Sequence, residues 1–140
     1  MSEGFLDAIK SGKIQPPESA KTLGLTFVSY DADKMSIELE FDGRPTFANP
    51  IGIVQGGFLA AMLDDAMGLA SAATMQLGQF APTLNLNVQF HRPAQIGKIQ
   101  ATGRVTMRGS SVLQLAGELR QSGKVLATGT ATGLIRNMGK

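Results

Sequence analysis

The chain has 140 residues, the usual size of one domain, and it is long enough to bury a hydrophobic core. Its 13 basic and 11 acidic side chains leave a net charge of +2, and the basic residues are scattered, so we expect no nucleic-acid partner. There is no cysteine, which excludes disulfides, thiolate metal sites and cysteine nucleophiles. We expect a single domain over residues 1–140.

The N-terminus predicts no secretory signal, because Met1–Phe5 carries an early acid and lacks a basic region before an apolar run. The apolar stretch Phe58–Ala73 has Asp64 and Asp65 at its middle, and two central acids are costly in lipid. We therefore expect a cytoplasmic protein with no membrane contact.

The N-terminal part predicts one helix and two strands. Residues 3–10 favour a short amphipathic helix, and a loop through Gly12 and Pro16-Pro17 follows. Leu25–Tyr30 is a mixed strand candidate, whereas Met35–Phe41 alternates apolar and polar residues strictly, as a half-buried strand does.

A long helix is predicted over Phe58–Ala73, preceded by a turn at Gly56. Apolar side chains recur at helical spacing over one broad arc: Phe58, Leu59, Met62, Leu63, Ala66, Leu69, Ala70 and Ala73. The opposite arc holds Ala60, Asp64, Gly68 and Ser71, which are small apart from the acid. Such a helix should be buried on nearly all sides, and its small-residue stripe lets another group approach Asp64 closely.

The chain after Gly78 predicts strands over 84–90, 97–107, 111–120 and 125–135, with a strong hairpin signal at Gln121–Lys124. We expect these four strands to form a meander. A helix segregated from an antiparallel sheet makes the fold class α+β.

The central acids lack a cation nearby in sequence, since no Lys or Arg lies between Arg44 and Arg92. A buried, unpaired carboxylate tends to raise its pKa, and in a confined site it is a candidate general base or nucleophile. The two acids lie about 100° apart on the helix, so at most one faces a given cleft. We favour Asp64 and expect Asp65 to be ion-paired or exposed. It stays open that both acids are paired by distant basic residues or face solvent.

The turn Gln55-Gly56-Gly57 begins the helix and leaves backbone N–H groups without intrahelical acceptors. Reinforced by the helix dipole, these groups could hold a developing oxyanion, although a plain tight turn is the alternative. Gly56 and Asp64 are eight residues apart, about 12 Å along a helix, so a compact ligand would not touch both in one chain. Either an extended substrate lies along the helix, or the two meet across a subunit interface.

At these residues the sequence resembles a known family. Asn49–Asp64 is similar to the signature of hotdog-fold acyl-CoA thioesterases of the phenylacetate-degradation (PaaI-like) type, N-x-x-G-x-x-H-G-G followed by a helix that bears Asp. The resemblance continues through Pro82–Phe90 and Arg92–Ala94 into Gly97. It implies a sheet wrapped around the central helix and a homodimer, often a dimer of dimers. Across that interface Gly56 of one subunit would face Asp64 of the other.

The resemblance also implies an activity, the hydrolysis of an acyl-CoA thioester with a medium-chain or aryl acyl group. The Gly56 N–H would polarise the thioester carbonyl, and Asp64 would attack it as nucleophile or activate water as base. Asn49 would orient the water or the leaving group, and Thr83 would assist near Asp64. Coenzyme A enters only as part of the substrate, and no cofactor is expected.

One departure concerns Gln55, which stands where the family commonly has His. Glutamine can donate a hydrogen bond but cannot titrate near neutral pH. A non-catalytic acyl-CoA-binding protein with a degenerate site is therefore an alternative. A hotdog dehydratase is another, although those enzymes usually pair a His with an acid.

The remaining candidates concern substrate binding and metals. Substrate-binding roles are predicted for Gly57, Gly68, Arg92, Arg108, Gly109 and Ser110. The two arginines and the turn at 109–110 suit coenzyme A phosphates, although solvated turn residues are an equal reading. The single histidine, His91, is expected to be structural or exposed, and a lone histidine without cysteine leaves metal catalysis without its usual ligands.

Overall fold

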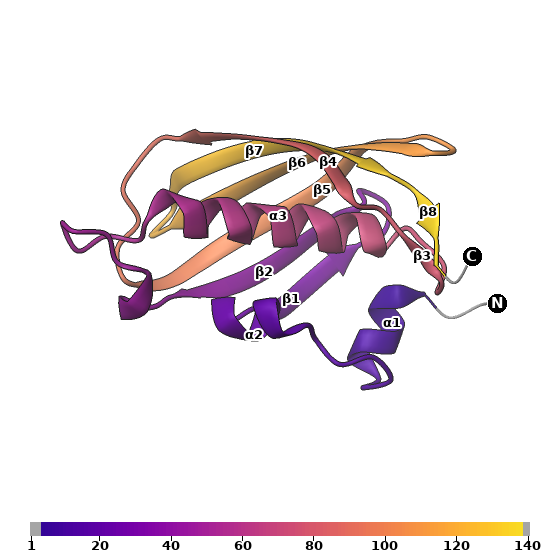
Figure 1. Ribbon diagram of the computed structural model, residues 1–140, viewed down its shortest axis with the longest axis horizontal. Coiled ribbons are helices and arrows are strands. Elements are labelled where there is room, and N and C mark those ends of the chain that lie inside the picture. Colours follow the sequence, from indigo (N-terminus) through magenta and orange to yellow (C-terminus); the bar gives the residue numbers. More distant parts are fainter. Residues whose placement is uncertain (1–3, 139–140) are drawn as a thin grey trace.

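A computed structural model describes residues 4–138, so residue 3, the predicted start of the first helix, lies outside the described residues (Figure 1). The helices are α1 (Phe5–Lys10), α2 (Glu18–Leu23), the 3-10 helix η1 (Pro45–Phe47) and α3 (Gly56–Ala72). The strands are β1 (Thr26–Asp31), β2 (Ser36–Gly43), β3 (Gln79–Phe80), β4 (Thr83–Phe90), β5 (Gly97–Arg108), β6 (Val112–Gln121), β7 (Lys124–Leu134) and β8 (Arg136–Asn137).

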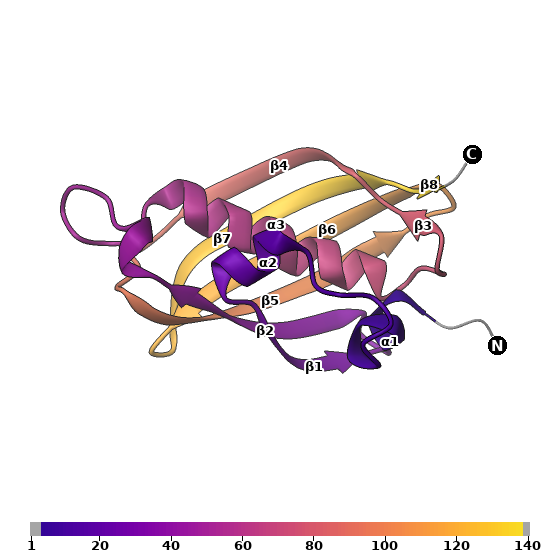
Figure 2. The same ribbon diagram turned by 60° about the horizontal axis from the view of Figure 1, so that its bottom comes forward.

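One antiparallel sheet curves around α3, with the strand order β1-β2-β5-β6-β7-β4 (Figure 1). The helix packs mainly on β5 and β6 and also contacts β2, β7 and β4. Helices α1 and α2 lie over the side of α3 that the sheet leaves open (Figure 2). The predicted α+β class, a sheet wrapped around one long helix, is confirmed.

The predicted four-stranded meander is wrong in one connection. Strands β5, β6 and β7 follow one another as expected, but β4 pairs with β7 at the sheet edge and not with β5. Residues 91–96 carry the chain from this edge to the centre of the sheet, where β5 pairs with β2. The reason is that alternation fixes which face a side chain takes but not which strand lies beside it.

The helix lies unusually close to the sheet over a row of three glycines. Gly103 pairs with Gly117, and Gly117 pairs with Gly129, so the row crosses β5, β6 and β7 beneath α3. A Cβ on Gly103 would overlap the carbonyl oxygen of Ala66 in the helix. Only glycine permits this approach of two backbones.

The buried face of α3 differs in part from the predicted arc. Most apolar residues expected there are buried, but Met67 is buried as well. Ser71, expected in the small-residue stripe, is also buried, and its hydroxyl donates to the carbonyl oxygen of Gly68 at 2.9 Å. This internal hydrogen bond lets a serine lie in the apolar contact.

Helix α2 is not among the predicted elements, because the double proline indicates only a loop when it is considered alone. Pro17 is the residue before the helix, where a missing N–H costs nothing, and Gly24 ends it with a φ of 66°. Proline before a helix and glycine after it is a recognised pair of boundary signals.

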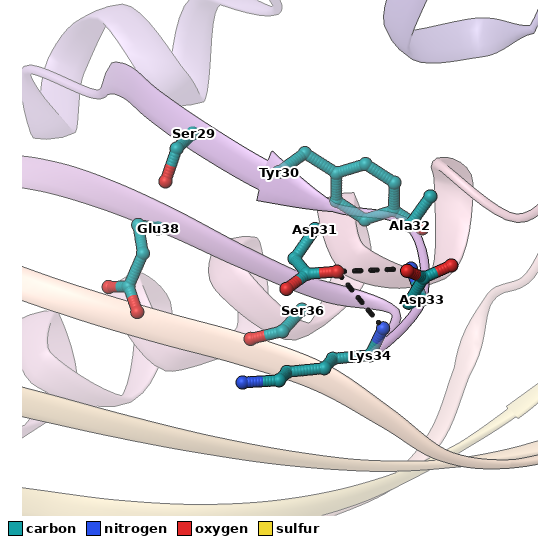
Figure 3. A pocket seen from close by; sticks show the side chains of 8 residues that line it. All are labelled: Ser29, Tyr30, Asp31, Ala32, Asp33, Lys34, Ser36 and Glu38. Atoms are coloured by element: carbon teal, nitrogen blue, oxygen red, sulfur yellow. Dashed lines mark hydrogen bonds between the residues drawn. The ribbon is translucent and has the colours of Figure 1, made fainter.

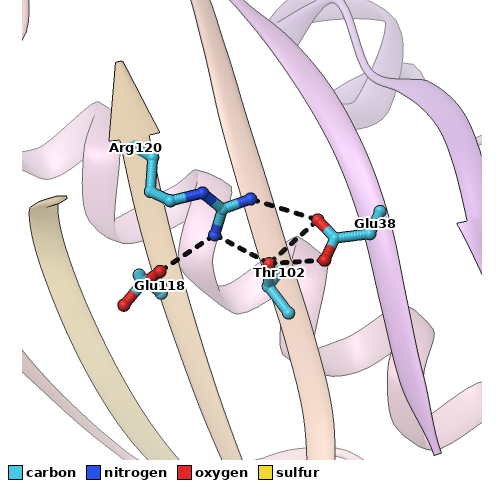
Figure 4. Close-up of polar contacts among 4 residues, drawn as sticks. All are labelled: Glu38, Thr102, Glu118 and Arg120. Atoms are coloured by element: carbon cyan, nitrogen blue, oxygen red, sulfur yellow. Dashed lines mark hydrogen bonds and ion pairs between the residues drawn. The ribbon is translucent and has the colours of Figure 1, made fainter. Parts of the chain in front are cut away.

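The outer face of the sheet carries paired charges (Figure 4). The Arg120 guanidinium lies 3.2 Å from Glu38 and 2.9 Å from Glu118, and it donates to the Thr102 hydroxyl at 2.8 Å. Thr102 in turn donates to Glu38. Arg120 of β6 therefore neutralises Glu118 on its own strand and Glu38 on β2, across the intervening β5. Among the described helices, none combines the length and apolarity needed to cross a membrane.

Candidate active site

The loop before α3 is held by Asn49. Its side-chain oxygen accepts the backbone N–H of Ile51 at 3.1 Å and of Ile53 at 3.3 Å, and its own N–H donates to the Ile53 carbonyl. These hydrogen bonds close a tight loop from which the chain enters α3. The hydrogen bonds of the Asn49 side-chain oxygen therefore stabilise the loop. The role of Asn49 in orienting the water or the leaving group stays a prediction.

The start of α3 presents free backbone donors. Within residues 4–138 the N–H groups of Gly56 and Gly57 have no acceptor, and Gln55 precedes them with an exposed side chain that makes no capping hydrogen bond. A Cβ on Gly57 would meet nothing within 4 Å, whereas one on Gly56 would lie 3.1 Å from the ring of Phe90 on β4. A helix N-terminus with open N–H groups attracts partial negative charge.

Asp64 is held by the edge strand. Thr83 is the first residue of β4, and its hydroxyl donates to Asp64 Oδ1 at 2.9 Å. The sequence motif predicted this proximity, and the structure brings the two residues together. Because the hydroxyl fixes one carboxylate oxygen, the other keeps its lone pairs for a ligand.

Neither helix acid is neutralised by a cation from the described part of the chain. The ion pairs among the described residues involve Glu18, Asp42, Glu38 and Glu118, and none involves Asp64 or Asp65. Pairing by distant basic residues, which the sequence left open, is therefore absent from residues 4–138. This contrasts with the matched charges of the outer face.

Asp65 departs from the expectation that it would be paired or exposed. One of its oxygens, Oδ2, is buried and has no hydrogen-bond partner among the described residues. Burial first, and then the negative charge of Asp64, raise the pKa of Asp65 to about 6. The sequence held a signal for this, since Leu69 and Ala72 follow Asp65 at helical spacing and form one apolar side of the helix.

A cavity of about 640 Å³ opens beside both acids. Asp64, Asp65, Gly68 and Thr83 line it together with apolar side chains of α1, α3 and β1. The structure thus brings three of the predicted site residues, Asp64, Gly68 and Thr83, to one cavity. Gly56, Gln55 and Asn49 lie at the other end of the helix and do not line it.

The candidates for coenzyme A phosphates are separated. Arg92 donates to the Val125 carbonyl, near the start of β5, whereas Arg108 ends that strand and donates to Thr74 and to the Gly109 carbonyl. A strand of this length spans about 36 Å, so the two arginines of one chain cannot hold the same phosphate. The Gly109-Ser110 turn stays beside Arg108, as predicted from sequence order.

A second cavity, of about 570 Å³, lies at the hairpin between β1 and β2 (Figure 3). Here the carboxylate of Asp31 accepts the backbone N–H groups of Asp33 and Lys34, and it closes the turn. Burial and the neighbouring Asp31 raise the pKa of Tyr30. Apart from Ala32, the residues of this cavity are polar, and none of them lines the cavity beside Asp64.

His91 lies outside the site. Its Nε2 is 2.8 Å from the hydroxyl of Thr128 on the sheet, and the residue is exposed. Across residues 4–138 no three His, Asp or Glu side chains gather in a way that could hold a metal ion.

Comparison with known proteins identifies the family. Residues 51–128, more than half of the chain, match the model of the thioesterase superfamily. The chain belongs to the thioesterase superfamily. The match starts two residues after Asn49 and contains all of α3 and Thr83, so the residues around Asp64 lie within the matched range.

Solved structures agree with this assignment. A phenylacetic acid degradation-related protein of Ralstonia eutropha JMP134 is 40% identical, with a TM-score of 0.91 over 94% of this chain and 99% of that one. The phenylacetic acid degradation protein PaaI of Thermus thermophilus, in a mutant form, is 23% identical, with a TM-score of 0.75 over 84% and 98%. A thioesterase of Haemophilus influenzae is 18% identical, with a TM-score of 0.82 over 100% and 95%. The last two share the fold, which is the predicted hotdog fold, and the chain is PaaI-like.

Proposed function

We propose that this thioesterase-superfamily protein hydrolyses an acyl-CoA thioester and that Asp64 is its catalytic carboxylate. The observation that carries the proposal is the setting of Asp64. It has no cation partner among residues 4–138, one of its oxygens is fixed by Thr83 at 2.9 Å, and it opens on a cavity of about 640 Å³. A carboxylate kept free of ion pairs retains its basicity toward water and its reactivity toward a carbonyl.

The reaction needs an oxyanion donor close to Asp64, and the donor is proposed to come from a second copy of the chain. The free N–H of Gly56 lies on the same helix as Asp64, about 12 Å away, which is too far for one carbonyl. Strand β4 ends the sheet with an unpaired edge and exposes Leu84, Leu86 and Phe90. Pairing of two β4 edges would cover these residues. It would bring the partner close to Thr83 and Asp64.

The chemistry can follow either of two routes. As nucleophile, Asp64 adds to the thioester carbon, the carbonyl oxygen becomes an oxyanion on the partner's Gly56 N–H, and the thiolate of coenzyme A leaves. Water then hydrolyses the acyl-aspartate anhydride. As base, Asp64 takes a proton from water as the water oxygen adds to the same carbon; the tetrahedral intermediate then breaks its C–S bond, and the leaving thiolate takes up the proton. Both routes give a carboxylic acid and a thiol, and in both the amide N–H stabilises the charge that develops on oxygen.

The test is a panel of acyl-CoA thioesters with detection of the released thiol. Asp64→Asn should lower kcat by about 10² to 10⁴ and leave binding of the substrate largely unchanged. Asp65→Asn, the same change one residue further along, is the matched control and should retain most of the turnover. An equal loss in both variants would contradict the assignment of Asp64. Single turnover in oxygen-18 water separates the routes, since only the nucleophile acquires label in its carboxylate.

Gln55 favours one alternative, a protein that binds acyl-CoA without turnover. The family commonly has His at this position, and here the exposed glutamine side chain makes no capping hydrogen bond. Binding without release of thiol across the panel would support this alternative, above all if Gln55→His gains activity. Homodimer formation, the dimer of dimers and the cytoplasmic location stay predictions, and sedimentation at several protein concentrations tests the first two.

A further inference from the structure

The cavity beside Asp64 is closed by an N-terminal segment that precedes the range matched by the family model. Its outer wall comes from residues 6–27, which include most of α1, all of α2 and the start of β1. In Figure 2, α2 crosses in front of α3. The family model begins only at residue 51. These wall residues therefore lie outside the range that the family model matches.

The wall is apolar where it faces α3. Leu6 and Ile9 line the cavity from α1, Pro16 from the following loop, and Phe27 from β1. On the opposite side Gly68 leaves open space, since a Cβ there would meet nothing within 4 Å. A volume of about 640 Å³ is in the range of cavities that enclose small-molecule ligands.

The two lysines of the wall, Lys10 and Lys21, each interact with a neighbouring side chain of the wall segment. The Lys10 ammonium lies 4.6 Å from the centre of the Phe27 ring, and Lys21 is paired with Glu18 at 2.7 Å. Both residues are exposed, so their charges are held at the outside of the wall. Away from Asp64 and Asp65, the interior thus suits an uncharged hydrocarbon group. Asp64 and Thr83 line the same cavity, so such a group would extend directly from a carbonyl placed at Asp64.

We propose that residues 6–27 form the acyl-binding wall of the enzyme, and that Ile9 and Gly68 determine how long an apolar acyl group it accepts. This inference rests on the proposed function for the identity of its occupant. The substrate class that follows is a thioester of an apolar acyl group of several carbons. The acyl group would lie between α3 and the N-terminal helices of the same chain that supplies Asp64.

Binding of S-alkyl coenzyme A thioethers tests the wall without requiring turnover. In the Asp64→Asn protein, titration calorimetry with butyl, hexyl, octyl and decyl thioethers should show affinity rising about fourfold, or about 0.8 kcal/mol, per methylene until the cavity is full. Ile9→Trp and Gly68→Leu each fill the cavity from opposite sides. In both, octyl affinity should fall by at least about 15-fold, the value of two lost methylenes, while butyl affinity changes less than about threefold.

The control is Ile14→Trp, which places the same bulky side chain in the same segment but does not touch the cavity and should behave like the parent. Ile9→Ala tests the wall in the other direction and should extend the rise in affinity to a longer chain, so the inference stays testable if Ile9→Trp does not fold. The inference would be overturned if both Ile9 variants bound the four thioethers with the same affinities as the parent, or if affinity in the parent did not depend on chain length. If the panel of thioesters gives no thiol while the alkyl series behaves as expected, the proposed function fails and the wall stands.

Discussion

Replacing Asp65 by Asn should change the pH dependence of stability. The pKa of Asp65 rises from 3.8 to about 6 in the folded protein, first because the carboxyl is buried and then because Asp64 is adjacent. The unfolded chain therefore releases this proton at lower pH than the folded one, and ionisation favours unfolding. The free energy of unfolding should fall as pH rises from about 4 through about 6, and the penalty is complete above that range.

The size of the penalty follows from the displaced pKa. A difference of about two pKa units corresponds to at most about 3 kcal/mol, and the partial exposure of the carboxyl reduces this to about 1–2 kcal/mol. Asp65→Asn cannot ionise, so relative to the wild type it should gain about 1–2 kcal/mol more at pH 8 than at pH 4. Any cost of placing an amide there is the same at both pH values and cancels in this comparison.

The assay is urea denaturation of both proteins at pH 4 and pH 8, at one protein concentration, with an NMR titration of the Asp65 carboxyl as a direct measurement. Glu18→Gln is the matched control, because it removes an exposed acid that pairs with Lys21 on the surface. It should show no comparable gain at pH 8. A gain by Asp65→Asn that is equal at both pH values, or larger at pH 4, would refute burial as the cause.

Three further outcomes follow from the contacts described above. Gly103→Ala should cost more than about 3 kcal/mol in chemical denaturation, because its Cβ would overlap the Ala66 carbonyl. Gly117→Ala should cost clearly less, because the nearest atoms to its Cβ are flexible side-chain atoms at 3.1 and 3.2 Å and the backbone oxygen of Thr102 is 3.4 Å away. Equal costs would contradict the backbone contact at Gly103. Thr83→Val should lower kcat up to about tenfold, because the hydrogen bond to Asp64 is lost, whereas Thr83→Ser should retain activity. Equal rates in the wild type and both variants would count against the role of Thr83. Arg120→Gln should lower the free energy of unfolding by about 1 kcal/mol at low salt and by less at 1 M salt, because Glu38 and Glu118 lose their shared cation. A loss of stability that does not depend on salt would show that packing, not charge, is responsible.

Several features of this protein were determined by local sequence alone. The period of the apolar residues placed α3 within two residues of its observed start and one of its end. Strict alternation in Met35–Phe41 identified β2 and its buried face. The motif from Asn49 to Asp64 indicated the family that the comparison with known proteins confirms. These predictions succeed because helical period, strand alternation and turn chemistry depend on only a few neighbouring residues.

Contacts between distant segments were decided only by the tertiary structure. Alternation does not choose a neighbour, so the position of β4 beside β7 required the folded sheet. The burial of Asp65 depends on the elements that pack around it in space, which no window around residue 65 contains. Arg92 and Arg108 were grouped by their chemistry, but the length of β5 holds them apart. The cavity wall joins residues 6–27 to α3 across more than 30 positions of sequence, so its partners were fixed by packing alone.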